Sequence, residues 1–263
     1  MEYNATSYTR SGAQGRAPGS SQSGPGAPGG RDQLLSSSVV RYVRGEFRQS
    51  IDAVALEVPL EILLNGRRTV TTMRTPGADI DLALGQLLTS GLVPHYVQFE
   101  FLDFQETDEA IQVHCPVAGR FPAPEPGARQ AMETPMAELA AKLLAMRATL
   151  EERQRLHRHT GATHCAMFFD QDCAPVSFGE DVGRHNAFDK CVGDAVRRAA
   201  LARARHAVIT SRLSHEIVSK AVRTGISVLA GFSVATSNAV DMAREHGMVL
   251  VGRLRDETMV IYE

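Results

Sequence analysis

Residues 180–186 bring charged and reactive side chains into one short turn: Glu180, Asp181, Val182, Gly183, Arg184, His185 and Asn186. The Arg184 guanidinium could bind an anion, and the His185 imidazole could transfer a proton near neutral pH. Gly183 beside them allows a close approach of the backbone to a ligand. A surface turn whose carboxylates lie near a helix N-terminus would have the same composition, because the helix dipole favours negative charge there. The residues alone leave both interpretations open.

Two further turns follow predicted strands, at residues 210–215 and 231–238. In an open α/β sheet, ligands bind at the carboxyl ends of the strands, where helix N-termini present N–H groups. The second turn combines small residues and hydroxyl groups with Phe232, whose ring offers a stacking face. These features favour a phosphorylated ligand with a flat ring, whereas the alternative is that Ser and Thr only cap helices. The residues in question are Phe232, Ser233, Val234, Ala235, Thr236 and Ser237.

The chain has four cysteines without a close pair: Cys115, Cys165, Cys173 and Cys191. Cys191 falls on an apolar helical stripe and is predicted to be buried. Cys115 follows a strand and precedes a Pro/Gly-rich stretch, so we expect it to be exposed, with Arg120 nearby to favour the thiolate. A lone cysteine is nevertheless more often structural than catalytic. The sequence lacks CxxC and paired Cys/His spacings, and it therefore predicts no bound zinc.

Composition places the chain among ordinary globular proteins, with 43% hydrophobic and 22% charged residues in 263. The 28 basic and 30 acidic residues give a net charge of −2, which offers no support for nucleic-acid binding. No apolar run reaches the ~20 residues of a membrane span, and the first residues do not resemble a secretory signal. We expect a cytoplasmic protein with reduced thiols and no membrane or nucleic-acid partner.

Three regions are predicted along the chain. Residues 1–35 form a Gly/Ser/Pro-rich tail that is predicted to be disordered. Residues 36–125 form a β-rich subdomain, with a hairpin at Asn65-Gly66 between strands at 56–64 and 69–73, a helix at 79–88, and strands at 97–104 and 110–115.

Residues 126–263 are predicted to form an α/β domain. A helix is expected from 136 to about 156, a hairpin from strands at 164–169 and 174–178, and a helix from 187 onward. Strands at 207–210, 226–230 and 248–251 then alternate with helices at 216–223 and 238–245, which indicates parallel strands covered by helices. A last strand at 258–262 is expected to be an antiparallel edge.

Four stretches, in this order, resemble the formate dehydrogenase accessory sulfurtransferases of the FdhD/NarQ type. They are Met-Arg-Thr-Pro-Gly at 73–77 with Leu-Ala-Leu-Gly at 82–85, Thr-Gly-Ala-Thr-His at 160–164, Glu-Asp-Val-Gly-Arg-His-Asn-Ala at 180–187, and Phe-Ser-Val-Ala-Thr-Ser at 232–237. Together they cover nearly the whole predicted folded region. The third motif is specific by itself.

The resemblance implies a cytoplasmic accessory protein that receives sulfur from a cysteine desulfurase and passes it to the bis(molybdopterin guanine dinucleotide) molybdenum cofactor of formate dehydrogenase. It implies a cytidine-deaminase-like, three-layer C-terminal region, a cofactor-binding loop at Phe232–Ser237 and a homodimer. Deaminase chemistry does not carry over, because the His-x-Glu and Pro-Cys-x-x-Cys zinc signature is missing.

The chain departs from the family at the sulfur-carrying cysteine. Members have a CxxC loop after the N-terminal strands, whereas residues 115–124 here read Cys-Pro-Val-Ala-Gly-Arg-Phe-Pro-Ala-Pro. Cys115 is the only thiol near that position and is shifted toward the strand. This departure concerns sulfur transfer and leaves the motifs implied in cofactor binding intact.

The preferred hypothesis is a molybdenum-cofactor sulfurtransferase. In it Cys115 carries persulfide sulfur, the Phe232–Ser237 loop holds the guanine dinucleotide end, and Arg184 and His185 supply charge and hydrogen bonds. The alternative is a non-catalytic chaperone that delivers the cofactor without sulfur. A third and weaker hypothesis is an enzyme acting on free nucleotides, which would rest on fold analogy alone.

Overall fold

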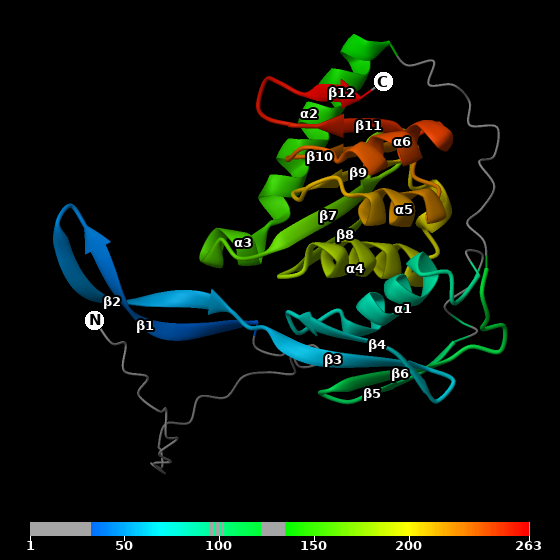
Figure 1. Cartoon of the computed structure of the whole chain (residues 1–263), viewed down its shortest axis with the longest axis horizontal. Coiled ribbons are helices and arrows are strands. Elements are labelled where there is room, and N and C mark those ends of the chain that lie inside the picture. The colour runs from blue at the N-terminus through cyan, green and yellow to red at the C-terminus, as the bar shows by residue number, and fades with distance from the viewer. Residues whose placement is uncertain (1–32, 95–96, 98–99, 101, 122–134, 263) are drawn as a thin grey trace, which may run out of the picture. The chain divides into compact units, whose positions relative to one another are not determined.

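The hairpin predicted at Asn65-Gly66 is confirmed, since both residues take the positive φ angles, 50° and 78°, of a type I′ turn. The computed structural model describes residues 33–94, 97, 100, 102–121 and 135–262 (Figure 1). The hairpin joins β3 (Val58–Leu64) to β4 (Arg67–Arg74). These strands form a four-stranded sheet with β5 (Asp103–Glu106) and β6 (Ala110–His114), in the order β4-β3-β6-β5.

The pairs β3–β4 and β5–β6 are antiparallel, and β3 pairs with β6 in parallel. One detail of this sheet differs from the prediction. The strand expected from residue 97 begins only at Asp103. A reason lies in the backbone of Val97, whose N–H donates to the carbonyl of Pro94 and so forms a turn rather than extended chain.

A two-stranded ribbon before residue 56 was not predicted. It consists of β1 (Leu34–Val43) and β2 (Glu46–Ala55), and it begins two residues inside the predicted tail. Both of its faces are largely exposed, so burial does not impose a strong alternation on the sequence. The other residues of the predicted tail, 1–32, lie outside the described residues.

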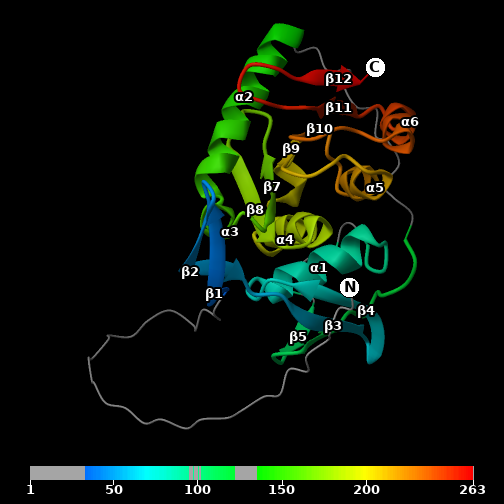
Figure 2. The same cartoon turned by 60° about the vertical axis from the view of Figure 1, so that its left-hand side comes forward.

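The second sheet has six strands in the order β12-β11-β10-β9-β7-β8 (Figures 1 and 2). The predicted parallel run is confirmed in β9 (His206–Ile209), β10 (Val228–Gly231) and β11 (Val249–Gly252). The predicted antiparallel edge strand is β12 (Val260–Tyr262). The predicted hairpin is β7 (His164–Phe169) with β8 (Pro175–Asp181), and β7 lies antiparallel to β9.

Helices cover both faces of this sheet (Figure 2). On one face, α2 (Met136–Arg153) packs its buried Leu139, Leu143 and Leu150 against inward residues of the sheet. The other face is covered by α4 (Arg184–Arg197), α5 (His215–Arg223) and α6 (Ser237–Glu245). The observed fold is therefore mixed α/β, as predicted, and the cytidine-deaminase-like detail stays a prediction.

The long helix expected from 136 to about 156 is interrupted. Gln154 has a non-helical ψ of 76°, and a separate short helix α3 (Arg155–Thr160) follows it. The Glu180 carboxylate accepts hydrogen bonds from the backbone N–H groups of Leu156 and His157, at 3.1 and 2.7 Å. These are donors that a helix N-terminus leaves unpaired, so Glu180 stabilises a new helix start at this point.

Helix α1 (Asp79–Thr89), which was predicted at 79–88, packs closely against α4. The close approach depends on two glycines. A Cβ on Gly85 would lie 1.9 Å from the carbonyl oxygen of Asp189, and a Cβ on Gly193 would lie 1.9 Å from that of Asp81. The described residues from 33 onward form one compact unit. The boundary predicted between residues 125 and 126 lies outside the described residues.

We predict that Gly193→Ala destabilises the protein by about 1–3 kcal/mol, because the new methyl group must push α1 and α4 apart. The direction of this change separates close packing from helix propensity, because a glycine-to-alanine change in a helix interior is otherwise stabilising by about 1 kcal/mol. Denaturant unfolding measures the change. Gly119→Ala, whose Cβ would meet only the Phe121 ring at 3.6 Å, is the control and should unfold like the parent chain. An unchanged or raised stability of Gly193→Ala would contradict the packing.

Candidate functional site

The turns after β9 and β10 are joined by backbone hydrogen bonds. The Leu213 N–H donates to the Val234 carbonyl at 3.1 Å, and the Thr236 N–H donates to the Leu213 carbonyl at 3.1 Å. The Tyr262 hydroxyl also accepts a hydrogen bond from the Ala235 N–H, at 3.1 Å. The two turns that the sequence singled out therefore form one structure at the carboxyl edge of the parallel strands.

A cavity of about 520 Å³ opens at this edge. Its size lies within the range of small-molecule sites. Thr210 after β9 and Phe232 after β10 line one side, and Thr163 and His164 lead into β7. The end of α2 and all of α3 supply the remaining wall, through Glu151, Gln154, His157, Arg158, Gly161 and Ala162.

Phe232 is the residue of the predicted cofactor loop that lines the cavity. The Arg147 guanidinium lies 5.2 Å from the centre of its ring, in a cation–π contact. Arg147 is not among the lining residues, so the Phe232 ring meets both this guanidinium and the cavity.

The other loop residues have backbone roles in the structure. The Ser233 carbonyl accepts a hydrogen bond from the Arg253 N–H at 2.8 Å, and Val234 and Ala235 pair with the preceding turn. Thr236 is the N-cap residue of α6 and Ser237 is its first residue. None of these five lines the cavity. Their predicted role in cofactor binding stays a prediction.

The hydroxyl groups at the starts of α5 and α6 do not cap their helices. Ser214 and Thr236 are the N-cap residues of α5 and α6, yet neither side chain makes a capping hydrogen bond. The Ser214 Oγ is buried and makes no hydrogen bond to the described residues. A buried hydroxyl without a partner is costly, and a ligand atom could satisfy it.

The two carboxylates of the 180–186 turn position other groups. Besides its contacts with α3, Glu180 accepts a hydrogen bond from the Thr163 hydroxyl at 2.8 Å, which fixes the cavity wall. Asp181 is fully buried and lies 2.7 Å from the Lys190 ammonium. It also accepts hydrogen bonds from the N–H groups of Thr75 and Gly183. The turn is therefore held rigidly at the start of α4.

Arg184 and His185 begin α4 and have buried nitrogen atoms without a hydrogen-bond partner among the described residues, Nε in Arg184 and Nε2 in His185. The Arg184 charge lies close enough to His164 to lower the pKa of that imidazole, after burial as the main cause. His164 lines the cavity, whereas Arg184 itself does not.

His185 points toward α5 instead. Its Nε2 is 3.0 Å from a carboxylate oxygen of Glu216, although the angles are not those of a hydrogen bond. Burial and the neighbouring Arg184 charge lower the His185 pKa. His185 does not line the cavity, and its predicted role in binding stays a prediction.

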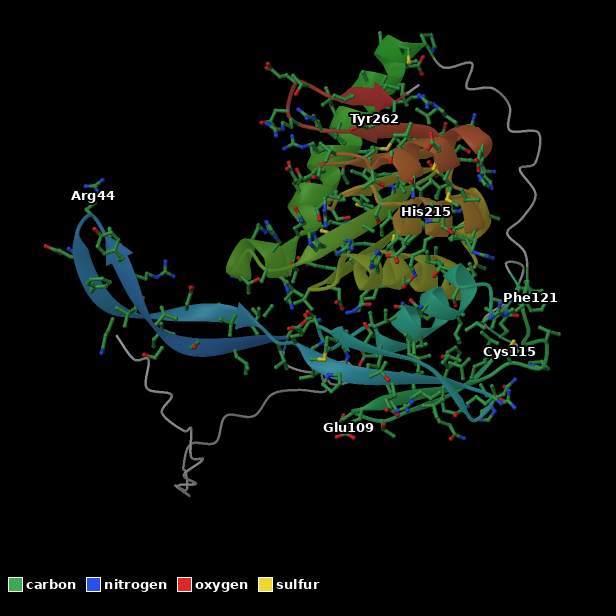
Figure 3. All side chains as sticks on the ribbon, viewed as in Figure 1. Arg44, Glu109, Cys115, Phe121, His215 and Tyr262 are labelled. Atoms are coloured by element: carbon green, nitrogen blue, oxygen red, sulfur yellow. The ribbon has the colours of Figure 1, made fainter. Side chains whose placement is uncertain are left out.

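The expected exposure of Cys115 is wrong, because only 2% of this residue is accessible. Its position continues the alternation of Ile111 and Val113, which places the thiol on the core face. Asn65 fixes the strand end through two hydrogen bonds of 2.9 Å with the Cys115 backbone. In Figure 3 Cys115 is labelled on the part of the structure that holds β3 to β6, and Tyr262 is labelled at the far side of the other sheet.

The other three thiols are not better placed. Cys165 and Cys191 are buried, and burial raises the pKa of both thiols. Cys173 is half-buried, and burial also raises its pKa. Each of these shifts disfavours the thiolate, which is the reactive form.

Sequence reasoning missed the α2–α3 wall of the cavity. Glu151 and Gln154 lie in what was predicted as continuous helix, and His157 and Arg158 lie just after its predicted end. Nothing in their local spacing indicated a site. Thr163 and His164 did carry a signal, since they end the Thr-Gly-Ala-Thr-His motif, but no role was assigned to them. Within the described ranges, every helix is too short or too polar to cross a membrane.

Comparisons with known proteins agree with the motifs. The chain matches the FdhD/NarQ family over residues 55–134 and 127–263. It is 36% identical over 256 residues to the sulfur carrier protein FdhD of Nocardia farcinica, covering 83% of this chain and 88% of the relative. It is 35% identical over 258 residues to the sulfur carrier protein FdhD of Streptomyces coelicolor, covering 85% and 92%.

A solved structure from Desulfotalea psychrophila has the same fold. Its protein is provisionally assigned as a formate dehydrogenase accessory protein. The TM-score is 0.73 at 22% identity, and the match covers 88% of this chain and 97% of that one. The family match spans far more than half of the chain, and the curated relatives match it over most of their length. The chain therefore belongs to the FdhD/NarQ family.

Proposed function

We propose that this chain is an accessory protein of formate dehydrogenase that binds the bis(molybdopterin guanine dinucleotide) molybdenum cofactor as its cargo and takes part in sulfur delivery to it. The observation that carries the proposal is the cavity at the carboxyl edge of the parallel strands, with Phe232 available for stacking. Its relatives are sulfur carrier proteins, which supports the sulfur role.

The residues around the cavity suit a nucleotide with a pyrophosphate. Phe232 would stack on the base, and His164, Thr210 and Arg184 would lie toward the phosphates. The nearby N-termini of α5 and α6 add N–H groups that favour negative charge. The unpartnered Ser214 hydroxyl and Arg184 Nε would gain acceptors from such a ligand.

For sulfur transfer we propose Cys115 as the acceptor from a cysteine desulfurase. The Cys115 thiolate would attack the terminal sulfur of the donor persulfide, the donor S–S bond would break, and the donor cysteine would leave as a thiolate. With 2% exposure, Cys115 cannot meet a donor until the strand end around it opens.

The cytoplasmic location and the homodimer also stay predictions.

A second candidate function is delivery of the cofactor without sulfur transfer. It is favoured by the burial of Cys115, Cys165 and Cys191 and by the raised pKa of the Cys173 thiol. The third hypothesis, turnover of free nucleotides, stays a prediction that rests on fold analogy alone.

We predict that the protein binds GDP, the nucleotide fragment of the cofactor, and that Phe232→Leu weakens this binding about tenfold. Leucine keeps an apolar side chain but removes the ring, and base–aromatic stacking is worth about 1–3 kcal/mol. Isothermal titration calorimetry gives both affinities. Val234→Ala, in the same loop but outside the cavity lining, should bind like the parent chain. Absence of GDP binding by the parent chain would refute the proposed function.

We predict that GDP binding at pH 7 is accompanied by proton uptake. Burial, Arg184 and His157 hold the His164 pKa below 6.5, so the free imidazole is neutral at pH 7. Bound phosphates favour the imidazolium and raise that pKa, and binding should strengthen as pH falls from 8 toward 6.5. Calorimetry in buffers of different ionisation enthalpy measures the uptake. His164→Gln should reduce it, whereas His159→Gln, outside the cavity lining, should not. Equal uptake in both variants would place the phosphates elsewhere.

We predict that incubation with a cysteine desulfurase and cysteine labels Cys115 with persulfide sulfur. Mass spectrometry locates the label, and Cys115→Ser should abolish it, while Cys173→Ser should leave it unchanged. A label on none of the four cysteines would contradict sulfur transfer and favour the delivery function. GDP binding is expected to survive in Cys115→Ser in either case, because Cys115 does not line the cavity.

A further inference from the structure

The wall of the cavity opposite the strands carries a carboxylate and an amide at one end. Glu151, in the last turn of α2, and Gln154, between α2 and α3, both line the cavity. Gln154 is only 6% exposed, and its side chain hydrogen-bonds the Cys165 thiol. An amide has two N–H donors and an acceptor oxygen, so a ligand in the cavity can pair with a donor that this bond leaves.

Arg147 connects this end of the cavity to the stacking ring. Its Nη2 lies 2.7 Å from Oε1 of Glu151, and its guanidinium lies 5.2 Å from the Phe232 ring centre. It also forms an ion pair with Asp256. The carboxylates of Glu151 and Asp256 hold the Arg147 guanidinium in place. Through this guanidinium, the positions of Glu151 and of the Phe232 ring are fixed relative to each other.

The side chains match the hydrogen-bonding edge of guanine. Guanine offers two neighbouring donors, N1–H and the N2 amino group, next to the O6 acceptor. A carboxylate has only acceptors, and an amide has an N–H donor as well as an acceptor. Adenine has an acceptor at N1, which a carboxylate would repel because both groups are acceptors. Hypoxanthine lacks the N2 amino group.

We propose that Glu151 is the specificity-determining residue for guanine, accepting hydrogen bonds from N1–H and the N2 amino group, with Gln154 as donor to O6. The inference rests on the proposed function and extends it, because it assigns the base end of the cavity to α2 and α3. A base stacked on Phe232 would have the phosphates directed toward Thr210 and His164.

The test compares GDP, IDP and ADP in calorimetric titrations of the full chain and of Glu151→Gln. The parent chain should bind GDP about 10- to 100-fold more tightly than IDP or ADP, because a site built to pair a polar group rejects a ligand that lacks it. In Glu151→Gln the affinity for GDP should fall until this preference is largely lost. The affinity for IDP should fall less, because hypoxanthine keeps N1–H but has no N2 amino group, and the affinity for ADP should not fall. Glu152→Gln, its exposed neighbour on the helix, is the matched control and should keep the preference.

Arg147→Lys separates recognition from support of the ring. Lysine keeps a positive charge for the Glu151 carboxylate but removes the guanidinium that contacts the Phe232 ring. The variant should therefore weaken GDP, IDP and ADP by a similar factor and keep the preference for GDP. An unchanged preference in Glu151→Gln, with GDP still bound by the parent chain, would overturn the assignment of Glu151 alone. If the parent chain binds none of the three nucleotides, the proposed function itself fails.

Discussion

The candidate site depends on the backbone hydrogen bonds that join the turns after β9 and β10. Leu213 donates to Val234 and accepts from Thr236, so the two turns continue the parallel pairing of their strands beyond the sheet. Parallel strands end at the same edge, and each is followed by a helix N-terminus. The pairing extends the β9–β10 register, in which the Phe232 N–H donates to the Ile209 carbonyl and so brings Phe232 beside Thr210.

The motifs that identify the family serve mostly to hold this edge in place. Asp181 and Lys190 form a buried ion pair, and Lys190 also donates to the Thr75 carbonyl at 2.7 Å. Asn186 donates to the Met73 carbonyl at 2.7 Å. Breaking a buried charge pair leaves an uncompensated charge, which is costly. Asp181 and Asn186 belong to the turn that the sequence singled out for its reactive side chains. In the structure they fix the start of α4 and therefore the position of Arg184.

Local patterns predicted the elements well wherever one face is buried. The apolar stripe of α4 and the turn at Asn65-Gly66 are clear in the sequence because burial and positive φ angles impose them. The ribbon β1–β2 has no such constraint and was missed. The alternation of buried residues in a strand also predicts the burial of Cys115, which continues the positions of Ile111 and Val113. The Pro/Gly-rich stretch after Cys115 favoured exposure instead.

The cavity wall could not be predicted, because it depends on contacts between distant segments. Glu180 lies 24 residues from Leu156, yet its carboxylate sets where α3 starts and so where Gln154 interrupts the helix. The sequence predicted one lining residue of the cofactor loop, Phe232, and the tertiary fold added the rest.

If this cavity holds the nucleotide end of the cofactor, a crystal structure of the chain with GDP will show where the nucleotide lies. We expect electron density for the base against the Phe232 ring, on the side away from Arg147, with the phosphates near Thr210 and His164. Well-defined GDP density elsewhere on the molecule, with this cavity empty, would contradict it.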